Sequence, residues 1–340
     1  MSIVYDPAEP PAPGHALEIR PGLFWVRMPL PFPPDHINLW LLDDGAAGFA
    51  IVDTGLHRED SKAHWLSAIG SRKISRVICT HFHPDHMGLA AWLCAHFGVE
   101  LWTTLGEYYT ARAVHAESSD ADVAHKVEFY RANGVAADAM GHFASPQSIY
   151  RRGVPDVPAF YRRIQGGQPF AVGETAWTPI IGRGHCPEHA CLWAPSSSIL
   201  IGGDILLPRI TPNIGVWPAE PLADPLGDYL ACLDGFAAVP EDALILPAHG
   251  QPYVGVHKRI AEIRAHHAER LDVLRAAFAG AAQGLSAVDC FPLLFKRPIG
   301  PHNVGLAVGE ALAHLHRLEC LGDARRMRDA EGIWRFSAAS

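Results

Sequence analysis

The chain has 340 residues, of which 49% are hydrophobic and 19% are charged, and its formal net charge is −8. This length suits one large α/β domain with a smaller appendage, and the acidic balance disfavours broad electrostatic attraction to nucleic acid. The longest apolar runs are far shorter than the roughly 20 residues that cross a bilayer, so the sequence predicts no membrane span.

Cysteine usage and the first residues set two further limits. The seven cysteines are scattered and form no CxxC pair, which argues against a disulfide framework and against a thiolate zinc cluster. Residues 1–14 lack the basic and apolar regions of a signal peptide, so we expect a cytoplasmic location. Histidine is the unusual residue, because there are 20 of them.

The first hundred residues alternate between strand and helix signals. Residues 16–53 contain three short β-type runs separated by turn residues, and residues 59–69 have the character of a helix. The run RVICT then predicts a strand, residues 87–97 a helix and VELWTT another strand. This βαβα order is typical of an α/β fold.

Residues 107–167 interrupt that order, because they are rich in Ala, charge and aromatic residues and predict helices. We interpret them as a helical insertion or cap. Strands resume between residues 169 and 204, and a helix near 226–238 and the strand ALILPAHG follow. The sequence therefore predicts a catalytic domain over residues 1–255 that carries this insertion.

Residues 256–340 change character again. Helices are predicted near 257–279, 286–295 and 303–320, and the last segment reads as a β-hairpin. Three helices followed by a hairpin predict a small winged-helix-like domain.

The stretch THFHPDH places His81, His83, Asp85 and His86 within six positions, directly after a predicted strand. In extended backbone His81 and His83 point the same way, and after Pro84 the other two begin a helix. Imidazole and carboxylate ligands suit zinc, iron or manganese, and the absence of thiolates disfavours a closed structural zinc site. The motif therefore predicts a metal site.

Further ligand types follow other predicted strands. His185 comes after WTPIIGRG, Asp204 ends ILIGGD and His249 follows LILPA, each close to glycines that allow near approach of the backbone. If two ions are bound, these three residues are the candidates to complete the coordination begun by THFHPDH.

This order of motifs resembles the metallo-β-lactamase-fold superfamily over roughly residues 16–255. The resemblance implies an αββα sandwich with two divalent ions, for which zinc is favoured and iron or manganese are alternatives. It also implies the ligands: His81, His83 and His185 for one ion, Asp85, His86 and His249 for the other, and Asp204 as a bridge. Asp53 in IVDTG matches the early aspartate that supports the metal site and fixes the tautomer of a ligand imidazole.

Neighbouring residues receive more ordinary interpretations. His189 is expected to support the site by hydrogen bonding rather than to bind metal, and Cys186 is expected to be packed. His36 and Asn38 either face the cleft or are residues of a strand edge, with the second favoured. Four further histidines lie on predicted helices, where a solvated face is the default: His266, His267, His314 and His316.

The implied activity is hydrolysis of a small ester, thioester or lactone by a hydroxide that bridges the metals, with Asp85 orienting that hydroxide. A metal-dependent phosphodiesterase or nuclease is an alternative, although residues 1–255 carry a net charge of −11, which repels a polyanion. A persulfide-dioxygenase-like enzyme with one iron is another alternative.

Substrate contacts and partners are less constrained by the sequence. Trp217 could line the mouth of the site, and the aromatic residues of the insertion could either cap an acyl group or only pack: Tyr108, Tyr109, Phe129, Tyr130, Tyr150, Phe160 and Tyr161. The C-terminal segment resembles the winged-helix appendage of some superfamily members, but its candidate recognition helix is mainly apolar. We therefore expect packing or homodimer formation there rather than DNA binding, with Arg325, Arg326 and Arg328 as its basic cluster.

Overall fold

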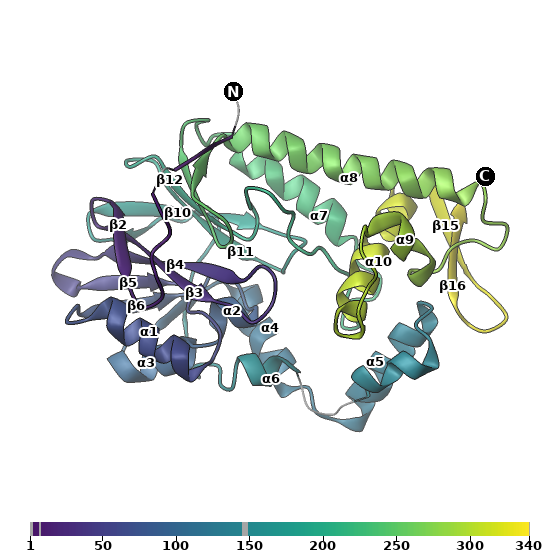
Figure 1. The fold of residues 1–340 in the computed structure, drawn as a ribbon, viewed down its shortest axis with the longest axis horizontal. Coiled ribbons are helices and arrows are strands. Elements are labelled where there is room, and N and C mark those ends of the chain that lie inside the picture. The colour runs from purple at the N-terminus through teal and green to yellow at the C-terminus, as the bar shows by residue number, and fades with distance from the viewer. Residues whose placement is uncertain (1–2, 7, 145–148, 340) are drawn as a thin grey trace. The chain divides into compact units, whose positions relative to one another are not determined.

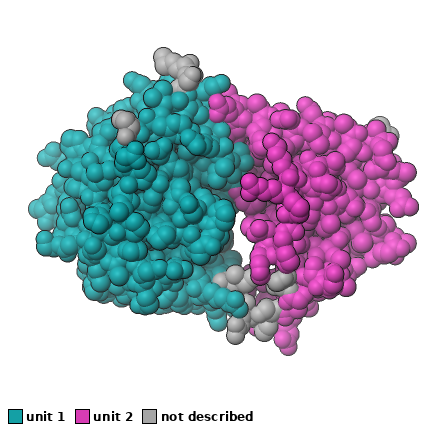
Figure 2. Space-filling view, viewed as in Figure 1, with its two compact units in different colours: residues 1–116, 148–212, 232–260 teal, residues 117–147, 213–231, 261–340 magenta. Residues whose placement is uncertain are grey.

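The computed structural model describes residues 3–6, 8–144 and 149–339 (Figure 1). Their contacts divide the chain into two compact units (Figure 2). Unit 1 contains residues 1–116, 148–212 and 232–260, and unit 2 contains residues 117–147, 213–231 and 261–340.

Unit 1 is built on two seven-stranded mixed sheets. The strands of the first, in spatial order, are β2 (Ala16–Arg20), β3 (Leu23–Pro29), β4 (His36–Asp43), β5 (Phe49–Val52), β6 (Ile74–Ile78), β7 (Leu101–Thr103) and β8 (Arg162–Arg163). Those of the second are β1 (Val4–Tyr5), β14 (Tyr253–Val254), β13 (Leu244–Pro247), β12 (Ile199–Gly203), β11 (His189–Ala194), β10 (Thr175–Gly182) and β9 (Phe170–Val172).

The two sheets enclose one apolar core and the helices create another. Trp25 and Trp40 of the first sheet, with rings 6.1 Å apart, belong to a cluster with Leu192 and Ile201 of the second sheet. The opposite face of the first sheet is buried against α1 (Glu59–Ile69), α3 (Ala90–Phe97) and α4 (Leu105–Ala116). This layering, which Figure 1 shows, is the predicted α/β sandwich.

Helix α1 shows how local sequence sets an element of the sandwich. Glu59 and Asp60 lie in its first turn, where the helix dipole favours negative charge. Trp65 and Ile69 face the core, and Gly70 follows with φ 58° and ends the helix. Its bounds are those predicted from the sequence.

The segment predicted as one insertion, residues 107–167, does not stay together. Helix α4, α6 (Ile149–Gly153) and β8 belong to unit 1, and β8 extends the first sheet beside β7. Residues 117–147, with α5 (Asp120–Ala132), belong to unit 2. A capping box closes the start of α5, because Ser119 and Asp122 bond each other's backbone N–H.

Unit 2 combines this segment with C-terminal elements. They are most of α7 (Pro225–Cys232) and of α8 (Val256–Phe278), then α9 (Phe291–Leu294), α10 (Val304–Cys320), β15 (Ala324–Arg328) and β16 (Trp334–Ala338). The predicted hairpin is confirmed, because β15 and β16 pair antiparallel. The winged-helix assignment stays a prediction. Among the described residues, the structure contains no helix with the length and apolar character of a membrane span.

Candidate metal centre

The predicted ligands gather at one edge of the two sheets because of how the strands pair. β5 and β6 run parallel with Val52 opposite Ile78, so Asp53 and the residues after Ile78 leave the first sheet together. β12 and β13 run parallel with Gly203 opposite Pro247. This register brings Asp204 and His249 to the same end of the second sheet.

The turn after β6 carries His81 and His83 and leads into the following helices. His81 is fully buried, whereas His83 is partly exposed. Pro84 begins the short helix α2 (Pro84–Met87), where its missing N–H costs no hydrogen bond, and Asp85 and His86 follow on that turn. The tight turn is what allows four ligand-type side chains so close in sequence to face one space.

Six of the seven predicted ligands form two groups of side-chain atoms, and the seventh, Asp204, groups with His81 and His86. The Nε2 atom of His81 lies 2.9 Å from Nδ1 of His83 and 3.3 Å from Nε2 of His185. In the second group Nε2 of His249 lies 3.5 Å from an Asp85 oxygen. Within each group the ligand atoms lie within 4.8 Å of one another, and the second group is completed by His86.

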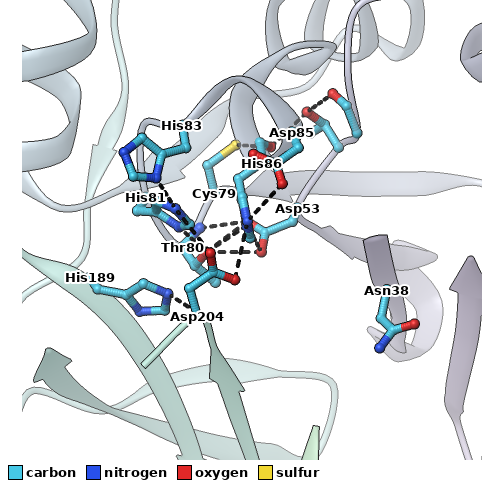
Figure 3. A network of polar contacts seen from close by, with 12 residues as sticks. Asn38, Asp53, Cys79, Thr80, His81, His83, Asp85, His86, His189 and Asp204 are labelled. Atoms are coloured by element: carbon cyan, nitrogen blue, oxygen red, sulfur yellow. Dashed lines mark hydrogen bonds and ion pairs between the residues drawn. The ribbon is translucent and has the colours of Figure 1, made fainter. Parts of the chain in front are cut away.

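Asp204 faces both groups with different oxygens. Its Oδ2 lies 3.3 Å from Nε2 of His185, whereas its Oδ1 lies 3.5 Å from Nε2 of His86 and 3.6 Å from Nε2 of His249. Figure 3 shows Asp204 reaching from its strand end toward His81 and His86. This is the placement that a bridging carboxylate requires.

Within the described part of the chain, two of these atoms are buried without a hydrogen-bond partner. They are Nε2 of His86 and Oδ1 of Asp204, both predicted ligand atoms. Buried polar atoms are nearly always paired in folded proteins, and an unpaired one costs about 1–3 kcal/mol. Nitrogen and carboxylate donors that converge on one space fit a divalent metal ion, so the residues present match the group that the motif implies.

The charge states of His81, His83 and Asp204 suit metal binding, whereas His86 would have to release a proton. Although burial opposes it, the carboxylates of Asp53, Asp85 and Asp204 raise the pKa of His86 well above its usual value. Burial and the neighbouring imidazoles lower the pKa of His81 and of His83 well below the usual value, so both rings are neutral and offer a lone pair. Burial alone would raise the pKa of Asp204, but His86 and His249 hold it well below the usual range. Neutral imidazoles and an ionised carboxylate are the forms that bind metal.

Asp53 makes the contacts that its predicted supporting role requires. Its Oδ2 lies 2.8 Å from Nδ1 of His86, and its Oδ1 accepts a hydrogen bond of 2.7 Å from the backbone N–H of Thr80. Asp53 has a φ of 59°, a left-handed conformation that Asp tolerates better than most residues. With a carboxylate at Nδ1, the proton of His86 stays there and Nε2 is left free as a ligand.

His189 also lies where the sequence reasoning put it, beside the ligands. Its Nε2 accepts a hydrogen bond of 3.2 Å from the backbone N–H of Asp204, so it fixes the residue that faces both groups. Gly203 makes room for this ring, because a Cβ there would lie 2.3 Å from Cε1 of His189. Cys186 is buried, as predicted.

His36 and Asn38 were favoured as ordinary strand-edge residues, and this interpretation missed their role. The His36 carbonyl accepts a hydrogen bond of 2.7 Å from Nδ1 of His249. Asn38 is fully buried and donates 2.9 Å hydrogen bonds to the carbonyls of Pro247 and Gly250. Both hold the turn that carries His249. The available signal was a polar residue inside the apolar run INLWLL, since a buried amide must find partners.

The aromatic residues of the segment 107–167 mainly pack. Tyr108, Phe129, Tyr130 and Tyr150 are buried, and Tyr108 stacks on Tyr161 with ring centroids 4.0 Å apart. Tyr109 and Phe160 are exposed.

Trp217 and the four helical histidines belong to unit 2. His267, His314 and His316 are buried, so the expectation of a solvated face is wrong for these three.

A two-sheet sandwich with His and Asp ligands at one edge defines an α/β metallohydrolase, and comparisons with known proteins agree. The family model of the metallo-beta-lactamase superfamily matches residues 32–249, and the model of the metallo-beta-lactamase-like C-terminal domain matches residues 271–339. The chain therefore belongs to the metallo-beta-lactamase superfamily and is a metal-dependent hydrolase.

Individual relatives are similar over most of the chain. A beta-lactamase domain protein from Burkholderia ambifaria is 38% identical, with 99% of this chain and 98% of that chain covered and a TM-score of 0.91. A metallo-beta-lactamase family protein from Thermus thermophilus is 25% identical over 94% of this chain and all of that chain, with a TM-score of 0.79. The probable metallo-hydrolase YqjP of Bacillus subtilis (strain 168) is 24% identical over 248 residues, 69% of this chain and 73% of YqjP.

Proposed function

We propose that this protein binds two divalent metal ions, zinc by preference, and hydrolyses a small ester, thioester or lactone. The observation that carries the proposal is the placement of Asp204, whose two oxygens face two separate groups of ligand atoms. His81, His83 and His185 would hold one ion, and Asp85, His86 and His249 the other. When bound, such ions lower the pKa of coordinated water and polarise a substrate carbonyl.

The side chains around the ions have distinct tasks. Asp85 lies 3.5 Å from Nε2 of His249 and 3.7 Å from Nε2 of His86, and in this proposal it orients the attacking water and accepts its proton. Asp53 and Asn38 hold His86 and the His249 turn, and this rigidity keeps the ligand atoms in place during the reaction.

A pocket beside His249 supplies room for a substrate. Its volume is about 370 Å³, which suits a small molecule. Its walls include Tyr5, Pro34, Pro208 and Ile210, so much of the lining is apolar and fits an acyl group.

The same pocket is lined by two cations, Arg27 and Arg209, and among the described residues neither forms an ion pair with a carboxylate within 4.0 Å. Arg27 donates hydrogen bonds to Asn38 and to the Gly250 carbonyl, and Arg209 donates one to the Tyr5 hydroxyl. Burial lowers the pKa of Arg27 to about 10, despite the opposing effect of Asp35, and the guanidinium stays charged at neutral pH. Acyl groups that end in a carboxylate are therefore expected to bind better than neutral groups of the same length.

A substrate panel tests the proposal. Metal-loaded protein is offered esters, thioesters, lactones and phosphodiesters, with acyl chains ending in either a methyl group or a carboxylate. Turnover of at least one carbonyl substrate is expected, and Asp85→Asn should lower kcat by at least about 100-fold. Activity on phosphodiesters alone, or oxygen consumption with one bound iron, would contradict the proposal.

A further inference from the structure

Glu107 is a buried carboxylate that the metal ligands do not explain. It lies in the first turn of α4, in the segment interpreted from the sequence as an insertion, and none of its surface is exposed. Among the described residues no Lys or Arg side chain forms an ion pair with it. Burying a carboxylate without such a partner costs several kcal/mol, so its hydrogen bonds must compensate.

Those hydrogen bonds go to the two loops that carry one group of ligands. One oxygen of Glu107 accepts a hydrogen bond of 2.9 Å from the backbone N–H of Phe82, which lies between His81 and His83. The other accepts one of 2.6 Å from the backbone N–H of Glu188, three residues after His185. A single side chain thus connects the turn after β6 to the turn before β11.

Further contacts strengthen the same connection. The hydroxyl of Tyr150 donates a hydrogen bond of 2.7 Å to the carbonyl of Phe82, so both polar backbone groups of Phe82 are bonded. In the reverse direction, a side-chain oxygen of Glu188 accepts a hydrogen bond of 2.7 Å from the N–H of Gly106. A Cβ at Gly106 would lie 2.9 Å from Cγ of Glu188, so a larger residue there would disturb this contact.

We propose that Glu107 is a positioning residue for one half of the metal centre, holding the loops of His81, His83 and His185 in the geometry that binds one ion. This inference rests on the proposed function. A change of Glu107 should affect the two ions differently, because the ligands of the other group have different supports. Asp53 holds His86, and His36 with Asn38 holds His249.

Glu107→Gln tests the proposal with little change of shape. An amide has one oxygen for two N–H donors, and its NH₂ group would face the second donor, so one loop loses its bond. The affinity for the ion at His81, His83 and His185 should fall about 10- to 100-fold, with the other ion changed less than threefold. Binding is measured by titrating the full chain with Zn²⁺ against a competing chelator, and by the visible spectrum of the Co²⁺ form.

Two variants separate positioning from loss of stability. Glu310→Gln removes another largely buried carboxylate, bonded to Arg270 at 2.6 Å within unit 2, and should leave both metal affinities unchanged. Tyr150→Phe acts on the same Phe82 peptide and should weaken the same ion a few-fold, so it decides the question if Glu107→Gln does not fold.

The outcomes distinguish this inference from the proposed function. If wild-type protein binds two ions and Glu107→Gln binds both with unchanged affinity, or loses both equally, the inference is wrong. If Tyr150→Phe must decide, an unchanged affinity at His81, His83 and His185 overturns the inference in the same way. If the wild-type protein binds no metal, the proposed function fails first.

Discussion

The function of a single side chain in this site depends on which of its atoms faces the metal position. The Nε2 atom of His86 can bind metal only if the proton of that ring is on Nδ1, and Asp53 keeps it there with a contact of 2.8 Å. The same carboxylate accepts the N–H of Thr80, so its second oxygen is already used. One residue therefore sets both the tautomer of His86 and the start of the turn that carries His81.

Replacing Asp53 with Asn should reverse this tautomer. The amide oxygen is needed by the N–H of Thr80, so the NH₂ group faces Nδ1 of His86 and moves the ring proton to Nε2. We expect the affinity for the ion at Asp85, His86 and His249 to fall about 10- to 100-fold, measured by zinc titration against a chelator.

Asp44→Asn is the matched control for this change. Asp44 is also a buried aspartate of unit 1, but it bonds Arg76 at 2.6 Å and the N–H of Gly173 at 2.7 Å. The Asp44→Asn change should lower the free energy of unfolding and leave the metal affinity unchanged. Equal affinities for Asp53→Asn and wild type would contradict the role given to Asp53.

The sequence could predict the ligands but few of their supports. His81 to His86 are recognisable from spacing alone, and His185, Asp204 and His249 from their positions after apolar strands. Asn38 and its hydrogen-bond partner Gly250 are 212 residues apart in the sequence, and Glu107 and its partner Glu188 are 81 residues apart. Which buried polar group pairs with which backbone amide depends on tertiary structure, and one sequence does not show it.

Helices α8 and α10 meet through a pair of buried histidines. Nδ1 of His267 lies 3.2 Å from Nε2 of His314, and among the described residues Nε2 of His267 has no hydrogen-bond partner. Burial, followed by the neighbouring His314 and by smaller effects from His266 and Arg270, lowers the pKa of His267 to about 3. Burial, Arg270 and His266 lower the pKa of His314 to about 4, although a hydrogen bond to the Glu310 carbonyl opposes them.

This pair should make unit 2 sensitive to acid. Both rings have the ordinary histidine pKa of 6.5 when the chain is unfolded, so below that pH the unfolded chain binds protons that the folded chain does not. Their contribution to stability is complete above pH 6.5 and is lost as pH falls toward 4, by up to about 1.4 kcal/mol per pH unit for each ring.

Urea unfolding between pH 7.5 and 4.5 measures this effect. In His267→Leu the free energy of unfolding should fall less steeply with falling pH than in wild type. The difference in slope should correspond to about one proton fewer taken up on unfolding. An identical slope would show that His267 is not the group that titrates on unfolding.

Element bounds were predictable where local signals are strong. Helix α1 has the predicted bounds, because acidic residues begin it and Gly70 ends it. Strand β8 was not predicted, because it has two residues, both exposed arginines, and no apolar alternation. It exists because the edge of β7 offers unpaired backbone groups, a property of the sheet rather than of the local sequence.

Across the whole molecule, the α/β class followed from the alternation of strands and helices, whereas the division into units did not. Residues 117–147 and 213–231 join the C-terminal segment in unit 2. In sequence both lie within the predicted catalytic domain. Composition marked a segment at residues 107–167 but not the boundaries near 117 and 147, and it marked none around 213–231. Such membership is decided by long-range contacts, for example the hydrogen bond of 3.0 Å from the N–H of Val216 to the carbonyl of Gly309.

We propose that seven side chains from distant parts of unit 1 form one centre for two metal ions that supports hydrolysis. Asp204 is the residue on which the two groups depend together, since its oxygens face both. Replacing Asp204 should therefore weaken the binding of both ions and the activity together. Replacing an aspartate that only stabilises the fold should change neither metal affinity.

The most direct measurement is the metal content of purified full-length protein after zinc reconstitution, wild type beside Asp204→Asn, with ester or thioester hydrolysis followed in the same samples. We expect about two zinc ions per wild-type chain, at most one in the variant, and a loss of activity of at least about 100-fold. A variant that keeps two ions and full activity, or a wild-type chain that binds none, would contradict the proposal.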